Sequence, residues 1–190
     1  MLILSMITPQ EPDGSYLDTC IAQMAVKDEA GLEGLYRETS ASVYAYALSI
    51  LKNTFDAEDV MHDCYLQAYH SAAGYRSSGK PMAWILTITR NLCFQKLREK
   101  SRTTDLPEET WELQPGENSC LSVDEKMLIE TSMQVLSDEG RQILVLHAVA
   151  GFRHREIAGL MNLRLPTVLS KYARAVKKLK LALEKEEHTP

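Results

Sequence analysis

From residue 156 to residue 174 the sequence reads Glu-Ile-Ala-Gly-Leu-Met-Asn-Leu-Arg-Leu-Pro-Thr-Val-Leu-Ser-Lys-Tyr-Ala-Arg. The first six of these residues predict a small amphipathic helix, in which Ala158 is small enough to let a second helix cross closely. Asn162 tolerates the left-handed conformation that a tight turn needs, and Pro166 is acceptable at the first position of a following helix. The stretch therefore predicts two short helices, about 153–161 and 166–184, joined by a tight turn.

The second of these helices is expected to have one apolar face and one polar, basic face. Its inward positions are Val168, Tyr172, Ala175 and Leu179, and its opposite positions are Thr167, Ser170, Lys171, Arg174 and Lys178. In a helix-turn-helix such a surface suits the major groove of DNA, because Lys and Arg bind phosphate while side chains near the helix start read base edges. The spacing favours DNA over the alternative, a plain helical hairpin with a solvated basic face.

The net charge of the whole chain argues mildly against nucleic acid, but the charge is segregated. The formal net charge of the 190 residues is −5. Residues 76–102 hold seven basic residues and one acidic residue, and residues 151–183 hold eight basic and one acidic. Residues 1–75 hold three basic and eleven acidic residues. Two compact basic blocks are the footprint expected of a phosphate-binding protein, although two solvated helix faces would give the same counts.

Composition excludes several other classes of protein. Apolar residues make up 45% of the chain and charged residues 25%, which is typical of a soluble globular protein. No uncharged apolar run approaches the ~20 residues that span a bilayer, and the apolar residues 1–7 lack the basic flank of a signal peptide. The four cysteines form no C-x-x-C pair and have no histidine at zinc-finger spacing, so we expect reduced thiols, some of them buried.

The rest of the chain has helical periodicity and no convincing alternating strand run, so an all-α fold is predicted. Apolar residues recur at three- and four-residue steps over residues 32–51 and again over 60–72. A turn-rich loop follows from residue 74 to Pro81, which can open a helix that runs to about residue 100. Residues 103–121 read as an acidic linker. A capping-box spacing at residues 122–125 and Ser137 predict the next two helix starts, and the second helix is expected to end at Gly151.

A second constellation combines aromatic and basic residues between residues 75 and 102. Tyr75 and Trp84 flank a loop that contains Arg76, Ser77, Ser78 and Lys80, and one face of the following helix carries Thr87, Arg90, Asn91, Gln95, Arg98 and Arg102. Aromatic rings stack on unpaired bases while cations follow the backbone of a single strand. The alternative is that Tyr75 and Trp84 belong to the core.

A third constellation is acidic and lies at the start of a predicted helix. Asp56, Asp59 and Asp63 fall at i, i+3 and i+7 and form a stripe on one helix face. No matching His/Asp cluster elsewhere completes a metal site, so a protein-binding face is the more economical functional interpretation. From the residues alone, a solvated helix start is favoured over both.

Taken together, the order and spacing of these motifs resemble a bacterial RNA polymerase sigma factor of the extracytoplasmic-function (ECF) group. The stretches Asp56-Ala-Glu-Asp-Val60, Tyr75-Arg76 and Ala83-Trp-Ile85 resemble sigma domain 2, and Glu156-Ile-Ala158 with Thr167-Val168 resembles sigma domain 4. The resemblance covers roughly residues 16–184. It implies an N-terminal extension over residues 1–15, a region 2-like domain over 16–102, an acidic linker over 103–121, a region 4-like helix-turn-helix domain over 122–184 and a tail over 185–190.

The resemblance also implies roles for residues whose function the motifs alone leave open. Docking on core RNA polymerase, at its β′ clamp helices, is implied for Asp56, Glu58, Asp59, His62 and Asp63, and the β flap is a second expected polymerase contact. Capture of the minus-ten promoter element is implied for Tyr75, Arg76, Ser77, Ser78, Lys80, Trp84, Arg90, Asn91 and Arg98. Contact with the minus-thirty-five element is implied for Thr167, Ser170, Lys171, Arg174 and Lys178.

Other expectations follow from the same resemblance. An anti-sigma factor is an expected partner, and the protein is expected in the bacterial cytoplasm or held at the membrane by that partner, without inserting into it. No enzymatic activity, small-molecule substrate or cofactor is expected, since the sequence shows no nucleophile–base arrangement, glycine-rich phosphate loop or metal set. The alternative function is an autonomous helix-turn-helix transcriptional regulator, which would usually dimerise to bind two half-sites.

Four positions depart from the pattern of the family. Pro166 stands where many relatives have glycine, Leu169 where lysine is common and Lys171 where arginine is common. Arg153 stands where a serine or threonine often caps the first helix of the motif. These departures bear on the preferred bases more than on docking to the polymerase.

Overall fold

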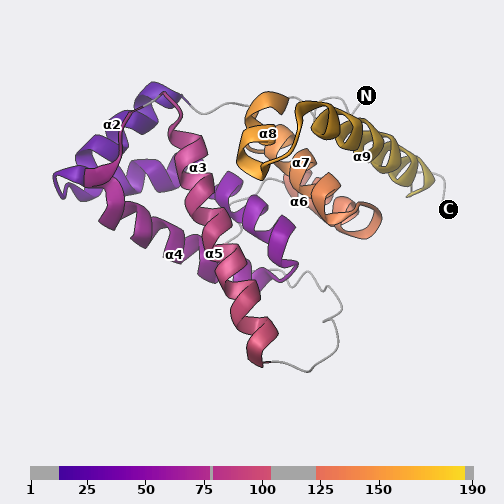
Figure 1. Ribbon diagram of the computed structural model, residues 1–190, viewed down its shortest axis with the longest axis horizontal. Coiled ribbons are helices and arrows are strands. Elements are labelled where there is room, and N and C mark those ends of the chain that lie inside the picture. Colours follow the sequence, from indigo (N-terminus) through magenta and orange to yellow (C-terminus); the bar gives the residue numbers. More distant parts are fainter. Residues whose placement is uncertain (1–12, 78, 104–122, 187–190) are drawn as a thin grey trace. The chain divides into compact units, whose positions relative to one another are not determined.

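All regular secondary structure is helical in residues 13–77, 79–103 and 123–186, which this computed structural model describes (Figure 1). The chain divides into two compact units. The first holds α2 (Gly14–Ala25), α3 (Glu29–Leu51), α4 (Thr54–Ser71), the 3-10 turn η1 (Ala72–Gly74) and α5 (Pro81–Thr103). The second holds α6 (Val123–Val135), α7 (Asp138–Ala148), α8 (His154–Met161) and α9 (Leu165–Glu186). The prediction of an all-α fold is confirmed.

Helix α3 is the central helix of the first unit, because α2, α4 and α5 all pack against it. The Asp28 carboxylate caps its start by accepting the Ala30 N–H at 3.0 Å. Its second half is buried on every side, from residue 42 to residue 51, and Tyr46 and Leu48 are among the most buried side chains of the protein. The apolar spacing over residues 32–51 thus predicted the helix that organises this core.

Helix α2 was not predicted from the sequence. Asp13 caps it through a 3.0 Å bond to the Ser15 N–H, and Leu17 and Ile21 lie on its buried face. It approaches α3 closely at Gly31, where an added Cβ would lie 2.3 Å from the Cys20 carbonyl oxygen. Glycine is therefore required at this crossing, since any side chain would push the two helices apart.

Buried thiols lie between α4 and α5. The Sγ of Cys64 lies 3.3 Å from the hydroxyl oxygen of Thr89, and Cys93 is also buried. Burial raises the pKa of Cys64 to about 11 and that of Cys93 to about 12, so both remain protonated and unreactive at neutral pH. Cys20 is also buried and free. The expectation that some of the cysteines are buried is confirmed for these three, whereas Cys120 lies outside the described residues.

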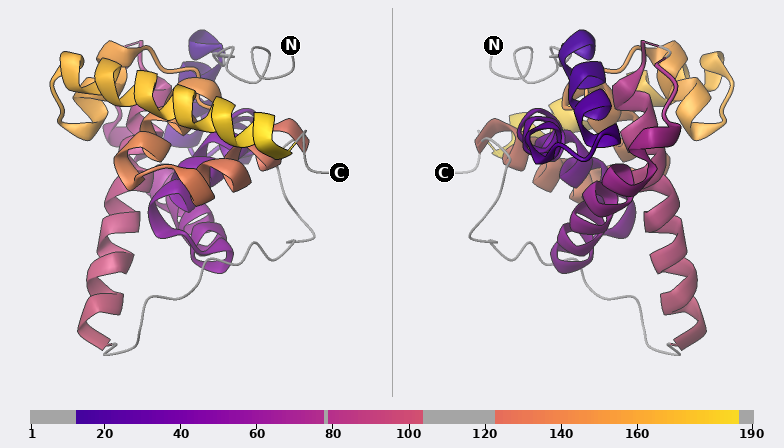
Figure 2. Two further views of the ribbon diagram at one scale, coloured as in Figure 1. Left: turned by 90° about the vertical axis from the view of Figure 1, so that its right-hand side faces the viewer. Right: turned by 90° about the vertical axis from the view of Figure 1, so that its left-hand side faces the viewer.

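In the second unit, α9 packs along α6, α7 and α8, as Figure 2 shows with α9 in yellow. Its core is aliphatic and includes Ile143, Leu144, Ile157 and Val168, all with no exposed surface. Burying these side chains gives the unit its main stabilisation, because each removes apolar surface from water.

The helix boundaries differ from prediction at the ends of α7 and α5, and one predicted capping hydrogen bond is not formed. Helix α7 ends at Ala148 rather than at Gly151, which instead adopts a φ of 73° in the turn that follows. The Phe152 N–H reaches back to the Leu146 carbonyl at 2.9 Å, so the chain reverses before the predicted end. Ser137 holds the N-cap position of α7, but its side chain makes no capping hydrogen bond. Helix α5 continues to Thr103, three residues past the predicted end.

The predicted capping box at residues 122–125 rests on Ser122, and most of the predicted acidic linker lies at 104–121, so both fall outside the described residues. No helix in the described part of the chain is long and apolar enough to cross a membrane.

Candidate nucleic-acid interface

Helices α8 and α9 form the predicted pair of helices with a tight turn between them. Helix α8 starts after Arg153, whose N–H donates to the Glu156 carboxylate at 3.1 Å and so satisfies one amide of the helix start. It ends at Asn162, which has φ 55° and ψ 44°, and the Leu163 N–H closes the turn on the Ala158 carbonyl at 2.9 Å. The prediction that Asn162 adopts the left-handed conformation is confirmed.

Helix α9 presents two different faces, as its sequence predicts. Val168 and Leu179 have no exposed surface and Ala175 has 3%, so these positions fill the core of the unit. The polar face comprises the exposed Ser170, Arg174 and Lys178 and the half-buried Thr167 and Lys171. Arg174 donates to the Ser170 carbonyl and hydroxyl oxygens at 3.2 and 3.3 Å.

Glu139 of α7 faces this basic surface and was not predicted as a functional residue. Its carboxylate is ion-paired with the Lys171 ammonium. A cavity of about 140 Å³ adjoins the pair between the start of α7 and α9, and its lining includes Ser137, Gly140, Lys171, Arg174 and Lys178. The cations make the cavity attractive to an anion, while Glu139 offsets part of that charge.

Three aromatic rings, one each from α7, α8 and α9, pack against one another in the second unit. The rings of His147 and His154 are 4.6 Å apart, and Tyr172 lies edge-on to both, at 4.9 and 4.6 Å. His147 Nδ1 is 2.8 Å from the Phe152 carbonyl oxygen. Burial, and then the neighbouring His147, lower the pKa of His154. The cluster packs against the inward side of α9, so it bears on how that helix is held.

The loop before α5 carries the second group of predicted DNA contacts. The rings of Tyr75 and Trp84 pack 4.9 Å apart at an angle of 52°, and both side chains are half-buried. Arg76, Ser77 and Lys80 are exposed, whereas Ser78 lies outside the described residues. The two aromatics therefore lie at the edge of the core, where a ring can both pack and present a surface.

The same loop is tied to α2 by a residue that sequence reasoning missed. The Asp18 carboxylate accepts hydrogen bonds from the Tyr75 hydroxyl at 2.7 Å and from the Ser77 hydroxyl at 2.8 Å. Its partners are 57 and 59 residues away in the chain, so no local sequence pattern indicates this contact.

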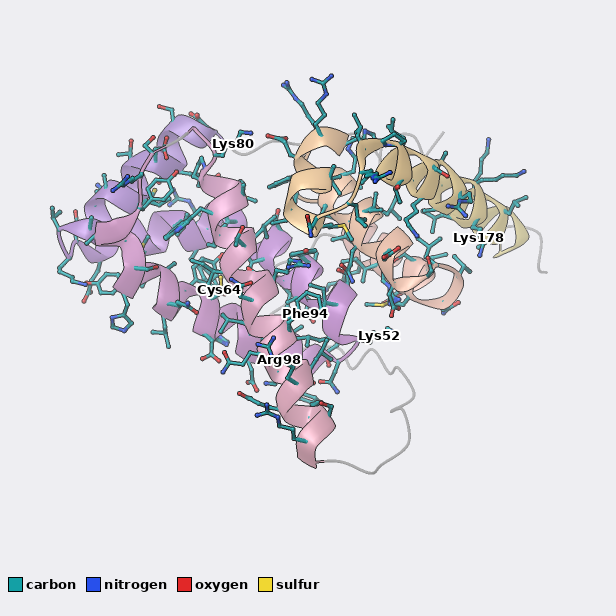
Figure 3. All side chains as sticks on the ribbon, viewed as in Figure 1. Lys52, Cys64, Lys80, Phe94, Arg98 and Lys178 are labelled. Atoms are coloured by element: carbon teal, nitrogen blue, oxygen red, sulfur yellow. The ribbon has the colours of Figure 1, made fainter. Side chains whose placement is uncertain are left out.

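Along α5 the predicted contacts spread over almost the whole helix. Lys80 lies just before its start and Arg98 far along it, as Figure 3 shows. The Arg90 guanidinium lies 4.7 Å from the centre of the Phe94 ring, and Asn91 is exposed. Arg98 thus lies well away from the loop, and the structure does not gather it with Tyr75 and Trp84.

Two acids at the start of α4, Asp56 and Asp59, pair with lysines of α5 but differ in exposure. Lys96 of α5 lies 3.4 Å from Asp56 and 2.7 Å from Asp59, and Lys100 lies 2.5 Å from Asp56. The side chain of Asp56 is 13% exposed and that of Asp59 is 68% exposed. Burial lowers the pKa of Lys96, but the two carboxylates outweigh it and raise that pKa above its ordinary value.

The remaining predicted members of this group lie near the surface. His62 and Asp63 are exposed and Glu58 is half-buried. Two large apolar side chains on the same helix, Phe55 and Leu66, are 60% and 58% exposed. Large exposed apolar side chains beside charges are typical of a protein-binding surface. Among the described residues, no group of three His, Cys, Asp or Glu side chains could hold a metal ion.

Comparison with protein families finds one match in each of the two units. Residues 35–103 match the family described as Sigma-70 region 2, and residues 126–179 match Sigma-70, region 4. Together the two matches define a chain with the two conserved regions of a sigma factor, in the expected order.

Individual relatives point to one group of sigma factors. The ECF RNA polymerase sigma factor SigK of Mycobacterium sp. (strain KMS) is 25% identical over 174 residues, covering 88% of this chain and 90% of that protein. SigK of Mycobacterium tuberculosis (strain ATCC 25177 / H37Ra) is 22% identical over 177 residues, covering 90% and 95%. The chain belongs to the ECF group of RNA polymerase sigma factors.

Two solved structures share the fold. The sigma factor RpoE of Bartonella quintana, in complex with the anti-sigma factor NepR, aligns with a TM-score of 0.61 at 23% identity, covering 75% of this chain and 89% of that one. CnrH, in complex with the cytosolic domain of CnrY, aligns with a TM-score of 0.60 at 20% identity, covering 90% and 98%.

Proposed function

We propose that this protein binds core RNA polymerase and directs it to promoters by recognising their minus-thirty-five and minus-ten elements and helping to melt the DNA. One observation carries the proposal: regions 2 and 4 of a sigma factor occur in order in one chain, and each presents an exposed face of the side chains that such contacts need. Residues 16–102 are assigned to the polymerase and the minus-ten element, and residues 122–184 to the minus-thirty-five element.

In this proposal α9 enters the major groove of the upstream element. Thr167 and Ser170 lie near its start, where side chains reach base edges, while Lys171, Arg174 and Lys178 lie nearer the phosphates. Lysine and arginine supply affinity that falls as salt rises, and the shorter side chains supply discrimination. The predicted face is exposed to solvent over most of its length.

The loop from Tyr75 to Trp84 captures unpaired bases of the minus-ten element. Flipping a base out of the stack costs a few kcal/mol, which stacking and a binding pocket must offset. Tyr75 and Trp84 offer ring surface, and Arg76 and Lys80 offer charge for the backbone of the single strand. Ser77, Ser78, Arg90 and Asn91 complete the proposed surface, and Arg98, farther along α5, is proposed as a separate contact with the DNA backbone.

Helix α4 docks on the β′ clamp helices through its exposed acids. Asp59, His62 and Asp63 form the contact, together with Glu58. Asp56 supports them from a half-buried position through its pairs with Lys96 and Lys100. The region 4-like unit makes the second contact, with the β flap. This division between contact and support follows from the exposure of each carboxylate.

An anti-sigma factor is the proposed regulatory partner. Both solved relatives described above are complexes, one with the anti-sigma factor NepR and one with the cytosolic domain of CnrY. We place the protein in the bacterial cytoplasm, where such a partner can also hold it at the membrane.

The test is reconstitution from purified components. The chain and core polymerase should form a complex, and this complex should transcribe from promoters mapped after overexpression, whereas core polymerase alone should not. Failure to bind core polymerase overturns the proposal. If instead the chain alone binds a palindromic duplex as a dimer, the autonomous regulator becomes the better description.

A further inference from the structure

Helix α2 reaches the loop that follows η1 through one carboxylate. Asp18 Oδ1 accepts the Tyr75 hydroxyl at 2.7 Å, and Asp18 Oδ2 accepts the Ser77 hydroxyl at 2.8 Å. Each oxygen therefore binds a different loop residue. Hydrogen bonds to an ionised acceptor are shorter and stronger than neutral ones. Two of them from one side chain fix the direction of the loop as well as its position.

The other side of the loop is held by α5. The Tyr75 ring packs on the Trp84 ring, with 4.9 Å between the ring centres. The backbone N–H of Trp84 donates to the Lys80 carbonyl at 3.2 Å. The Tyr75 N–H also donates to the Ala72 carbonyl at 3.0 Å. Tyr75 is therefore held by Asp18, Ala72 and Trp84, and its ring is already oriented before any ligand binds.

The chemistry of Tyr75 keeps this anchor in place across the physiological range. Burial, and then the hydrogen bond and charge of Asp18, raise the pKa of the Tyr75 phenol above its ordinary value. The phenol therefore stays protonated and remains a donor to Asp18. Ser77 is exposed, so its bond to Asp18 orders a surface loop and adds little to the core.

We infer that Asp18 is a positioning residue that pre-organises Tyr75 and Ser77 for unpaired DNA, an inference that rests on the proposed function. Fixing a flexible segment costs conformational entropy, and a loop that is ordered before binding does not incur that cost when DNA arrives. Asp18 itself need not touch DNA, because it acts through Tyr75 and Ser77.

The test compares binding of two DNA probes by the complex of the full chain with core polymerase. The first probe is a bubble duplex, whose unpaired nontemplate strand carries the sequence that the wild-type complex selects from a randomised pool. The second is a fully paired duplex selected in the same way for the upstream element. The variants are Asp18→Ala, which removes both acceptors but favours the helix, and Asp18→Asn, which keeps the shape and can still bond both hydroxyls. Glu33→Ala removes an equal charge from the exposed surface of α3 and serves as the control.

Asp18→Ala should bind the bubble about tenfold more weakly, because two hydrogen bonds no longer order the loop. Its affinity for the paired duplex and for core polymerase should not change. Asp18→Asn and Glu33→Ala should behave as wild type, which separates the tether from the charge. In a double-mutant cycle, the losses caused by Asp18→Ala and Tyr75→Phe should be less than additive, because both variants remove the bond between Tyr75 and Asp18.

Equal affinity of Asp18→Ala and wild type for the bubble overturns the inference, and so does an equal loss on both probes. Should Asp18→Ala not fold, Tyr75→Phe decides, because it keeps the ring and removes the hydroxyl that donates to Asp18. Wild-type affinity of Tyr75→Phe for the bubble overturns the inference, and a loss confined to the bubble supports it. Failure of the wild-type chain to bind core polymerase overturns the proposed function, and this inference with it. If the wild-type complex binds both probes and Asp18→Ala binds them with the same affinity, the inference is overturned and the proposed function stands.

Discussion

The ammonium of Lys171 on α9 is ion-paired with the carboxylate of Glu139 on α7. Lys171 belongs to the face proposed to contact DNA, and Glu139 comes from the helix packed behind it. The two side chains are 27% and 50% exposed, so solvent and salt screen the pair. In the free protein, the Glu139 carboxylate pairs with a lysine that would otherwise be available to a DNA phosphate. DNA must therefore compete with Glu139 for Lys171.

Replacing Glu139 with Gln should therefore strengthen binding to the upstream element. The expected gain is about two- to fivefold in affinity, since an exposed ion pair is worth about 0.2–1 kcal/mol. The measurement is the dissociation constant of the complex with core polymerase on a paired duplex, as a function of salt.

Glu130→Gln makes the same charge change on α6 and should leave that affinity nearly unchanged. In the double variant Glu139→Gln with Lys171→Ala, the gain should disappear, because Lys171 is then absent. If Glu139→Gln raises the affinity for DNA equally with and without Lys171, Glu139 acts through the overall electrostatic potential of the unit and not through its pair with Lys171.

Two pairs of substitutions should separate DNA contact from polymerase docking. Lys171→Ala with Arg174→Ala should weaken transcription from promoters that need the upstream element by about tenfold or more, since two phosphate or base contacts are lost. Binding to core polymerase should persist. Asp59→Ala with Asp63→Ala should instead weaken binding to core polymerase. Titration of each variant with labelled core polymerase, followed by transcription at saturating protein, measures the two effects separately, and identical defects would refute the division of roles.

Asp56 should behave differently from the exposed acids beside it. Its side chain is 13% exposed and pairs with both Lys96 and Lys100. Asp56→Ala should lower the free energy of unfolding of the chain by about 2 kcal/mol, because a half-buried carboxylate that pairs with two lysines is lost. Denaturant titration measures this, with the exposed Asp63→Ala as the control that should stay within about 0.5 kcal/mol of wild type. Equal stability of the two variants would place Asp56 at the surface contact rather than beneath it.

The parts of this fold that were predictable are those encoded by short-range spacing. The left-handed Asn162 and the buried Val168 and Leu179 follow from residues a few positions apart, where helix periodicity and turn chemistry act directly. Leu17 and Ile21 of α2 have the same periodicity, but the segment is short and carries no motif, so it did not predict a helix.

The contacts that escaped prediction join residues distant in the chain. Glu139 approaches Lys171 from another helix, and Asp18 reaches Tyr75 across 57 positions. Lys96 similarly pairs with Asp59 from α5. Such pairings depend on how helices pack, which the spacing of apolar residues indicates only coarsely. The sequence spacing places Asp56, Asp59 and Asp63 on one helix face, but it does not indicate which of them pair with lysines of α5.

The stability of the second unit should fall as pH falls, through His154. Burial and His147 lower the pKa of His154 below its ordinary value, and Tyr172 and the Phe152 carbonyl crowd the same cluster. The unfolded chain therefore takes up this proton at a higher pH than the folded one, so the free energy of unfolding decreases as pH falls below about 6.5. Thermal unfolding of the full chain between pH 8 and pH 5.5 should show this decrease. His154→Gln removes the titrating group and should flatten the dependence, whereas His62→Gln, at an exposed site, should not. Parallel pH profiles for wild type and His154→Gln would show that protonation of His154 does not oppose the packing of α9.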